Sequence, residues 1–102
     1  MDRVAMLKEI LESSPDDAFA RYGLALEIAK SGDVDGALKE FKTILEKDPD
    51  YVPAYQMGAQ TLMDAGRHDE ARALLEKGVE VAKRTRNGHA LSEMEMMLQD
   101  CS

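Results

Sequence analysis

The feature that most constrains this chain is an internal repeat, which appears when the sequence is shifted by 34 positions. Pro15 then falls on Pro49, Gly32 falls on Gly66, and many apolar residues fall on apolar residues. A unit of this length cannot bury its apolar face alone, so its neighbours must stack against it. The N-terminal stretch joins the same register, since its apolar residues and its proline also have counterparts one period later: Val4, Leu7, Ile10, Leu11 and Pro15 fall on Leu38, Phe41, Ile44, Leu45 and Pro49.

The apolar spacing within each unit is that of an α-helix. In the first unit the apolar residues recur at i, i+1, i+4, i+7 and i+8, and the second unit does much the same. Gly32 and Gly66 can end helices in the left-handed conformation, and Asp33 can cap the helix that follows. Proline restricts the residue before it and removes a donor, so Pro15 and Pro49 mark turns. These patterns predict helices over 2–13, 18–31, 34–47, 52–65, 68–85 and 89–100.

Composition agrees with an all-helical fold. Alanine, leucine, glutamate, methionine and lysine are abundant, and these residues lose little rotamer freedom in a helix. There are only three prolines and no tryptophan. We therefore expect an all-α chain, and we expect the small residues Ala25, Ala37, Ala59 and Ala71 to let neighbouring helices approach closely.

The charge of the chain argues against two classes of partner. The formal net charge is −7, whereas nucleic acids and anionic membranes attract surfaces rich in lysine and arginine. No apolar run approaches the roughly 20 residues that span a bilayer. Cys101 is the only cysteine and has no internal disulfide partner, and the first residues lack an apolar export signal. We expect a cytoplasmic protein with no nucleic-acid or membrane partner.

The helix–turn–helix unit and its period resemble the tetratricopeptide repeat family. The residues that carry the resemblance are Leu24, Ala25, Ile28, Gly32, Ala37, Phe41 and Pro49 in one repeat and Tyr55, Ala59, Leu62, Gly66, Ala71 and Leu75 in the next. The chain departs from the pattern at Arg21, where the family often has an aromatic residue, at Gly58, where Met57 is expected to fill the space, and at Lys83. Because Lys83 replaces a closing proline, the fifth helix is expected to run long.

The resemblance implies an α-α superhelix of stacked antiparallel helix pairs, about two full repeats with flanking helices. It divides the chain into an N-terminal half-repeat helix over 1–16, repeats over 17–50 and 51–84, and a C-terminal capping helix over 85–102. In this arrangement the chain is a single domain, similar to the short stand-alone tetratricopeptide proteins of bacteria.

Catalytic and metal chemistry has little support in the sequence. His68, His89 and Cys101 are the obvious ligand or nucleophile candidates, but no pair has the spacing of a metal site. The segment Asp33–Gly36 resembles part of a calcium loop, but residue 42 is lysine where that loop needs glutamate. A helix cap with first-turn acids explains the segment better. We expect no cofactor, no metal and no enzymatic activity.

The resemblance also implies a binding surface, because tetratricopeptide units usually bind partners on the concave face lined by the first helix of each repeat. The expected lining consists of Phe19, Tyr22, Leu26, Lys30, Gln56, Met57, Gln60 and Met63, with Gly23, Pro53 and Asp64 beside them. Some family members clamp a partner's C-terminal carboxylate here with basic and amide side chains. Tyr22, Leu26 and Met57 occupy those places, so we expect an apolar groove for an apolar or amphipathic helical peptide.

Two alternatives remain open. Phe19 and Leu26 can instead be ordinary core, packed between repeats or under the last helix. The last helix is rich in methionine, and Met96 is predicted to be exposed because it falls off the apolar stripe. The leading hypothesis is therefore a protein-binding adaptor, and the alternative is a homo-oligomeric module, such as a homodimer, that associates through the C-terminal helix.

Overall fold

The computed structural model describes residues 2–101 and folds them entirely into helices and turns. The helices are α1 (Arg3–Ser13), α2 (Ala18–Lys30), α3 (Val34–Lys47), α4 (Val52–Asp64), α5 (His68–Arg84) and α6 (Gly88–Asp100), with no strand among the described residues. Each bound lies within one residue of the sequence prediction, so the predicted all-α fold is confirmed. None of these helices is both long enough and apolar enough to cross a membrane within residues 2–101.

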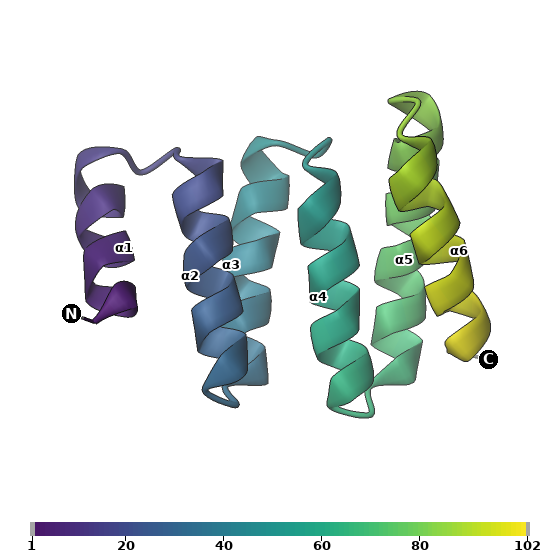
Figure 1. Ribbon diagram of the computed structural model, residues 1–102, viewed down its shortest axis with the longest axis horizontal. Helices are drawn as coiled ribbons and strands as arrows, with labels where there is room; N and C mark the ends of the chain where they lie inside the picture. Colours follow the sequence, from purple (N-terminus) through teal and green to yellow (C-terminus); the bar gives the residue numbers. More distant parts are fainter. Residues whose placement is uncertain (1, 102) are drawn as a thin grey trace.

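The helices stack in chain order as antiparallel hairpins in two layers. Helices α2, α4 and α6 form one layer, and α3 and α5 lie behind them (Figure 1). Consecutive helices make the main contacts, and α2 also touches α4, and α4 touches α6. Helix α1 packs on α2 at one end of the stack. The result is the predicted α-α arrangement, elongated at 39 × 29 × 20 Å.

Small and large residues alternate where the helices meet. Ala25 and Ala37 are fully buried where α2 meets α3, and Ala59 and Ala71 are fully buried where α4 meets α5. An alanine lets two helix backbones approach closely, so large side chains above and below can fill the remaining space. The largest fully buried side chains are Phe41, Leu75 and Met94, from α3, α5 and α6.

Glycine ends two of the helices as predicted. Gly32 and Gly66 have φ of +92° and +78° and follow α2 and α4. After α5 no glycine is available, and Arg86 adopts φ of +58° before α6 begins. Helix α5 runs to Arg84, in agreement with the expectation that lysine at residue 83 lets it continue.

The structure corrects one packing expectation. The space left by Gly58 is filled by Leu74 and Phe41, whose side-chain atoms would lie 2.9 and 3.6 Å from an added Cβ. Met57, expected to fill this space, instead lies half-buried against the core from α4. The reason is that Met57 is adjacent along the helix and points about 100° away from residue 58.

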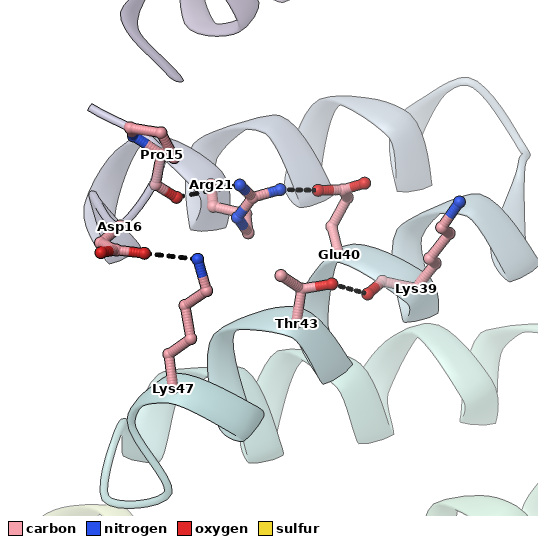
Figure 2. A network of polar contacts seen from close by, with 7 residues as sticks. All are labelled: Pro15, Asp16, Arg21, Lys39, Glu40, Thr43 and Lys47. Atoms are coloured by element: carbon pink, nitrogen blue, oxygen red, sulfur yellow. Dashed lines mark hydrogen bonds and ion pairs between the residues drawn. The ribbon is translucent and has the colours of Figure 1, made fainter. Parts of the chain in front are cut away.

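Arg21 replaces an aromatic residue by making polar contacts. Its guanidinium donates to the Glu40 carboxylate at 2.7 Å and to the Pro15 carbonyl at 3.0 Å. Lys47 at the end of α3 pairs with Asp16, which lies in the turn between α1 and α2 (Figure 2). These contacts tie the turn between α1 and α2 to α3, so an ionic network takes the place that a large ring has in the family pattern.

Candidate protein-binding cleft

A cleft of about 730 Å³ lies along α2 and α4, between the turns that end them. Its lining pairs positions that are one repeat apart, because equivalent positions on stacked helices face the same side. Gly23 and Met57, Leu26 and Gln60, and Lys30 and Asp64 are three such pairs. The full lining is Arg3, Gly23, Leu26, Glu27, Ala29, Lys30, Gly32, Val34, Met57, Gln60, Thr61, Asp64 and Ala65.

Four of the eight residues expected in the groove lie in this cleft: Leu26, Lys30, Met57 and Gln60. Leu26 and Met57 are half-buried, so part of each apolar side chain remains open to solvent. Gln60 donates a hydrogen bond to Asp64 at 2.9 Å across one turn of α4. Lys30 is exposed at the end of α2 and makes no ion pair with residues 2–101.

Phe19 and Tyr22 lie outside the cleft for opposite reasons. Phe19 is 80% exposed near the start of α2, so the alternative that places it in the core is wrong. Tyr22 is half-buried, and its ring packs edge-on against Phe41 with centroids 6.2 Å apart and beside Tyr51 at 5.8 Å. Burial, followed by the nearby Tyr51, raises the pKa of Tyr22. Tyr22 therefore anchors the contact between hairpins.

Gln56 and Met63 also lie outside the cleft. Gln56 donates a hydrogen bond to the Glu93 carboxylate on α6, which joins the middle and last helices of the front layer. Met63 is half-buried and packs against the core near the end of α4. Asp64 and Pro53, the two α4 residues expected beside the groove, also differ in position. Asp64 lines the cleft, whereas Pro53 is exposed elsewhere on α4.

Sequence reasoning missed two charged residues of the cleft. Arg3, at the start of α1, reaches the wall of the cleft and its Nε lies 2.9 Å from a carboxylate oxygen of Glu27 on α2. These residues are 24 positions apart, so neither helical spacing nor the internal repeat relates them. Only the packing angle of α1 on α2 brings them together, and no sequence pattern indicates it.

The candidates for metal or nucleophile chemistry are scattered. His68 is exposed at the start of α5, His89 pairs with Glu93 on α6, and Cys101 is buried against the core. Among the residues that the structure describes, no group of three or more His, Cys, Asp or Glu side chains is arranged so that it could hold a metal ion. In the segment that resembled a calcium loop, Asp33 caps α3 by accepting from the Gly36 amide at 2.9 Å, and Asp35 pairs with Arg67.

Comparison with known proteins identifies a matching repeat profile and a related sequence. The family profile described as tetratricopeptide repeat matches residues 29–94. An uncharacterized protein of Methanocaldococcus jannaschii is 36% identical over 62 residues, which are 61% of this chain and 72% of that protein.

Solved structures extend the match to nearly the whole chain. A tetratricopeptide repeat domain protein from Salinibacter ruber is 33% identical, with a TM-score of 0.79 over 86% of this chain and 89% of that one. A protein from Bordetella parapertussis, 24% identical, has a TM-score of 0.85 over 99% of this chain and 88% of its own.

The TPR2B domain of yeast Sti1, solved in a complex with pHsp70, is 22% identical. It has a TM-score of 0.88 over 96% of this chain and 78% of that one. The last two likenesses concern the fold alone. The repeat profile, which matches more than half of the chain, shows that this chain belongs to the tetratricopeptide repeat family, whose repeats mediate contacts between proteins.

Proposed function

We propose that this protein is a non-catalytic adaptor that holds an apolar or amphipathic helical segment of another protein in the α2–α4 cleft. The observation that carries the proposal is the cleft itself, whose floor includes Leu26, Ala29 and Met57 and whose rim carries Arg3 and Lys30. Concave, mostly apolar sites with a few placed polar groups are where proteins bind ligands. Methionine adapts its shape to varied partners.

The chemistry of the cleft favours a peptide over a small polar ligand. Its charged groups lie at the rim, where Arg3 already pairs with Glu27, and the lining residues come from equivalent positions of two stacked helices. Such a surface suits an amphipathic helix that lays its apolar face into a groove. The structurally similar Sti1 domain was solved in complex with a protein partner, pHsp70, which supports binding of protein segments by this architecture.

The test is a capture experiment with two matched variants. The cleft variant, Leu26→Gln with Met57→Gln, replaces apolar side chains by polar ones of similar length. The control variant, Met6→Gln with Ile10→Gln, makes the same kind of change at exposed apolar residues of α1 outside the cleft. After circular dichroism shows that both are folded, quantitative mass spectrometry compares the proteins each recovers from the native host. We expect the cleft variant alone to lose partners by about tenfold or more.

If both variants recover every partner as the wild type does, the cleft is not the binding surface. If only the control variant loses partners, the binding surface lies on the exposed face of α1. Either result contradicts the proposal.

A second candidate function, self-association through α6, rests on Met96. This side chain is 66% exposed, and the half-buried Leu91, Met97 and Leu98 lie on the same helix. An isologous contact between two copies of α6 would bury it. Sedimentation equilibrium of the wild type and of Met96→Gln tests this function. A concentration-dependent dimer that the substitution weakens is expected, and a wild-type monomer at every concentration contradicts it.

A further inference from the structure

A second hollow, of about 590 Å³, lies between α3 and α5 and shares no lining residue with the α2–α4 cleft. These two helices form the back layer (Figure 1). Leucines from three helices line it: Leu38 and Leu45 from α3, Leu62 from α4 and Leu74 from α5. Leu45 and Leu74 are half-buried, so they leave apolar surface open at its floor. We call this hollow the α3–α5 groove.

The rim of the α3–α5 groove carries an excess of positive charge. Its ionisable lining residues are Lys39, Lys42, Arg67 and Lys77 against Asp35, Glu46 and Glu70, which is four positive groups and three negative ones, or a net +1. The whole chain, by contrast, carries −7. The groove is therefore a positive region on a strongly negative protein.

The charges within the groove are unevenly paired. Arg67 donates to Asp35 at 2.7 Å and to Glu70 at 2.8 Å, so one cation engages two of the three carboxylates. This pairing lowers the pKa of Glu70, chiefly through its hydrogen bond with Arg67. Lys39, Lys42 and Lys77 are exposed and form no ion pair with residues 2–101. Lys39 and Lys77 thus have no carboxylate partner in the described chain, and Lys42 forms no ion pair, although its charge contributes to the lowered pKa of Glu70.

The cations beside the turn between α1 and α2 are paired within the chain. There Lys47 pairs with Asp16 and Arg21 pairs with Glu40, so both cations are neutralised within the chain (Figure 2). Lys39 stands beside this network, but only its backbone carbonyl takes part, accepting from the Thr43 hydroxyl at 2.9 Å. Lysines without an ion pair also lie elsewhere on the described chain, at Lys8, Lys30 and Lys83. What distinguishes the α3–α5 groove is that three such lysines border one apolar floor.

We propose that the α3–α5 groove docks an acidic amphipathic helix of a partner protein, on a site separate from the α2–α4 cleft. Leucines of that helix, spaced i, i+3, i+4 and i+7, would lie on Leu45 and Leu74. Acidic residues flanking that stripe would meet Lys39, Lys42 and Lys77. Because the rest of the surface is negative, it would repel such a helix and favour this groove. Helix α3 has 14 residues, so a partner of three to four turns, about 21 Å long, fits alongside it.

Synthetic peptides test the proposal directly. The probe is a capped peptide of about four turns with leucines on one face and glutamates flanking them. One control peptide keeps the leucines and replaces every glutamate by lysine. A second control is polyglutamate of equal charge, which has no apolar face. Titration calorimetry measures the affinity of each, and amide chemical shifts of the isotope-labelled protein locate the site. We expect only the probe to bind, with shifts centred on Lys39, Lys42, Leu74 and Lys77.

Charge-matched protein variants separate the groove from the general charge of the chain. Lys42→Glu with Lys77→Glu reverses two groove charges, and Lys8→Glu with Lys83→Glu reverses two exposed lysines outside the groove, so both variants carry a net charge of −11. The groove variant is expected to bind the probe about tenfold more weakly than the wild type, and the control variant within about twofold of it. The cleft variant of Leu26 and Met57 is expected to bind as the wild type does.

Three results would overturn the proposal. Equal affinity for polyglutamate and for the probe would mean that the leucines are irrelevant. Equal loss of affinity in the two charge-reversed variants would reflect net charge alone. Chemical shifts centred on the α2–α4 cleft would place the acidic helix in the first site. The capture experiment tests the α2–α4 cleft, and its outcome does not affect the peptide affinities or the chemical shifts that test the α3–α5 groove. Either proposal can therefore be contradicted without the other.

Discussion

At the scale of single residues, packing distances decide which positions accept a side chain. An added Cβ at Gly78 would lie 2.7 Å from the Met94 sulfur and 2.8 Å from Tyr55 Cβ, both well inside normal contact. At Gly88 an added Cβ would meet nothing within 4 Å. Gly78 therefore lets α4 and α6 close over α5, whereas Gly88 has no such packing role.

Gly78→Ala is expected to destabilise the protein by about 1–3 kcal/mol, the usual cost of overpacking a well-filled core. The sulfur of Met94 can rotate away, but Tyr55 Cβ is held by the backbone of α4, so the helices must separate. The free energy of unfolding from urea denaturation measures the effect. Gly88→Ala is the control and is expected to leave stability unchanged or slightly higher. Equal stabilities for the two variants would contradict this account of Gly78.

At the scale of helices, the N-termini differ in whether a side chain caps them. Side chains of Asp2, Asp17, Asp33 and Asn87 accept backbone amides at the starts of α1, α2, α3 and α6, whereas no side chain caps α4 or α5. Helix α4 instead has a proline in its first turn, and α5 has Asp69 and Glu70 there, which favour the positive end of the helix dipole. Each start thus has its own local means of satisfying or offsetting free amide groups.

The cap of α3 gives a prediction at this scale. Asp33→Ala is expected to cost about 1 kcal/mol, because the Gly36 amide loses its acceptor. Asp33→Asn is the control, since asparagine caps as well as aspartate and changes the net charge by the same amount as alanine does. Thermal unfolding followed by circular dichroism measures both. If the asparagine variant is as unstable as the alanine variant, the carboxylate acts through its charge and not through the cap.

At the scale of the whole molecule, ion pairs join each turn after a proline to the end of a helix in the next hairpin. Asp16 pairs with Lys47, and Asp50, one repeat later, pairs with Arg84 at 2.6 Å. The hydrogen bond to Lys47 lowers the pKa of Asp16, and that to Arg84 lowers the pKa of Asp50, both from 3.8. The aspartates are one repeat apart, but the basic partners are not: residue 81, one repeat after Lys47, is valine, and Arg84 lies three residues later at the end of the longer α5.

These lowered pKa values predict an acid dependence of stability. In the unfolded chain both carboxyls protonate near pH 3.8, before they would protonate in the folded protein. Their contribution is therefore complete above that pH and is lost as the pH falls through the lower folded values. Between about pH 5 and about pH 2 the melting temperature is expected to fall less in the Asp16→Asn, Asp50→Asn variant than in the wild type.

The matching control replaces Glu12 and Glu80 by glutamine, since both are exposed and form no ion pair within residues 2–101. This variant is expected to keep the wild-type pH dependence. A control that flattens the curve as much as the aspartate variant would show that total charge, and not the paired turns, sets the acid sensitivity.

The helices and most of their packing were predictable from the sequence. The internal repeat places Ala25 and Ala59, and Phe41 and Leu75, at equivalent positions, and the structure buries all four. Exposure of Met96 and the left-handed glycines at 32 and 66 were predicted as well. These features depend on neighbours along the chain or one period away, so a one-dimensional pattern contains them.

The binding surface was predictable only in part. Leu26, Lys30, Met57 and Gln60 line one cleft, whereas Tyr22 is drawn into an aromatic contact with Phe41. Helical periodicity places all eight groove candidates on the front helices α2 and α4, but it does not say how far each is covered by α3 or by the next hairpin. Arg3 and the unpaired lysines of the α3–α5 groove were likewise not predicted as parts of a surface.

The sequence by itself determined six helices, their order and the faces that they bury, because backbone hydrogen bonding and the burial of an apolar stripe are decided by residues close along the chain or one repeat apart. Only the tertiary structure decided which side chains line the same hollow and which basic side chains form no ion pair. Those properties depend on the angles at which hairpins stack, and many small contacts summed over the whole chain set these angles.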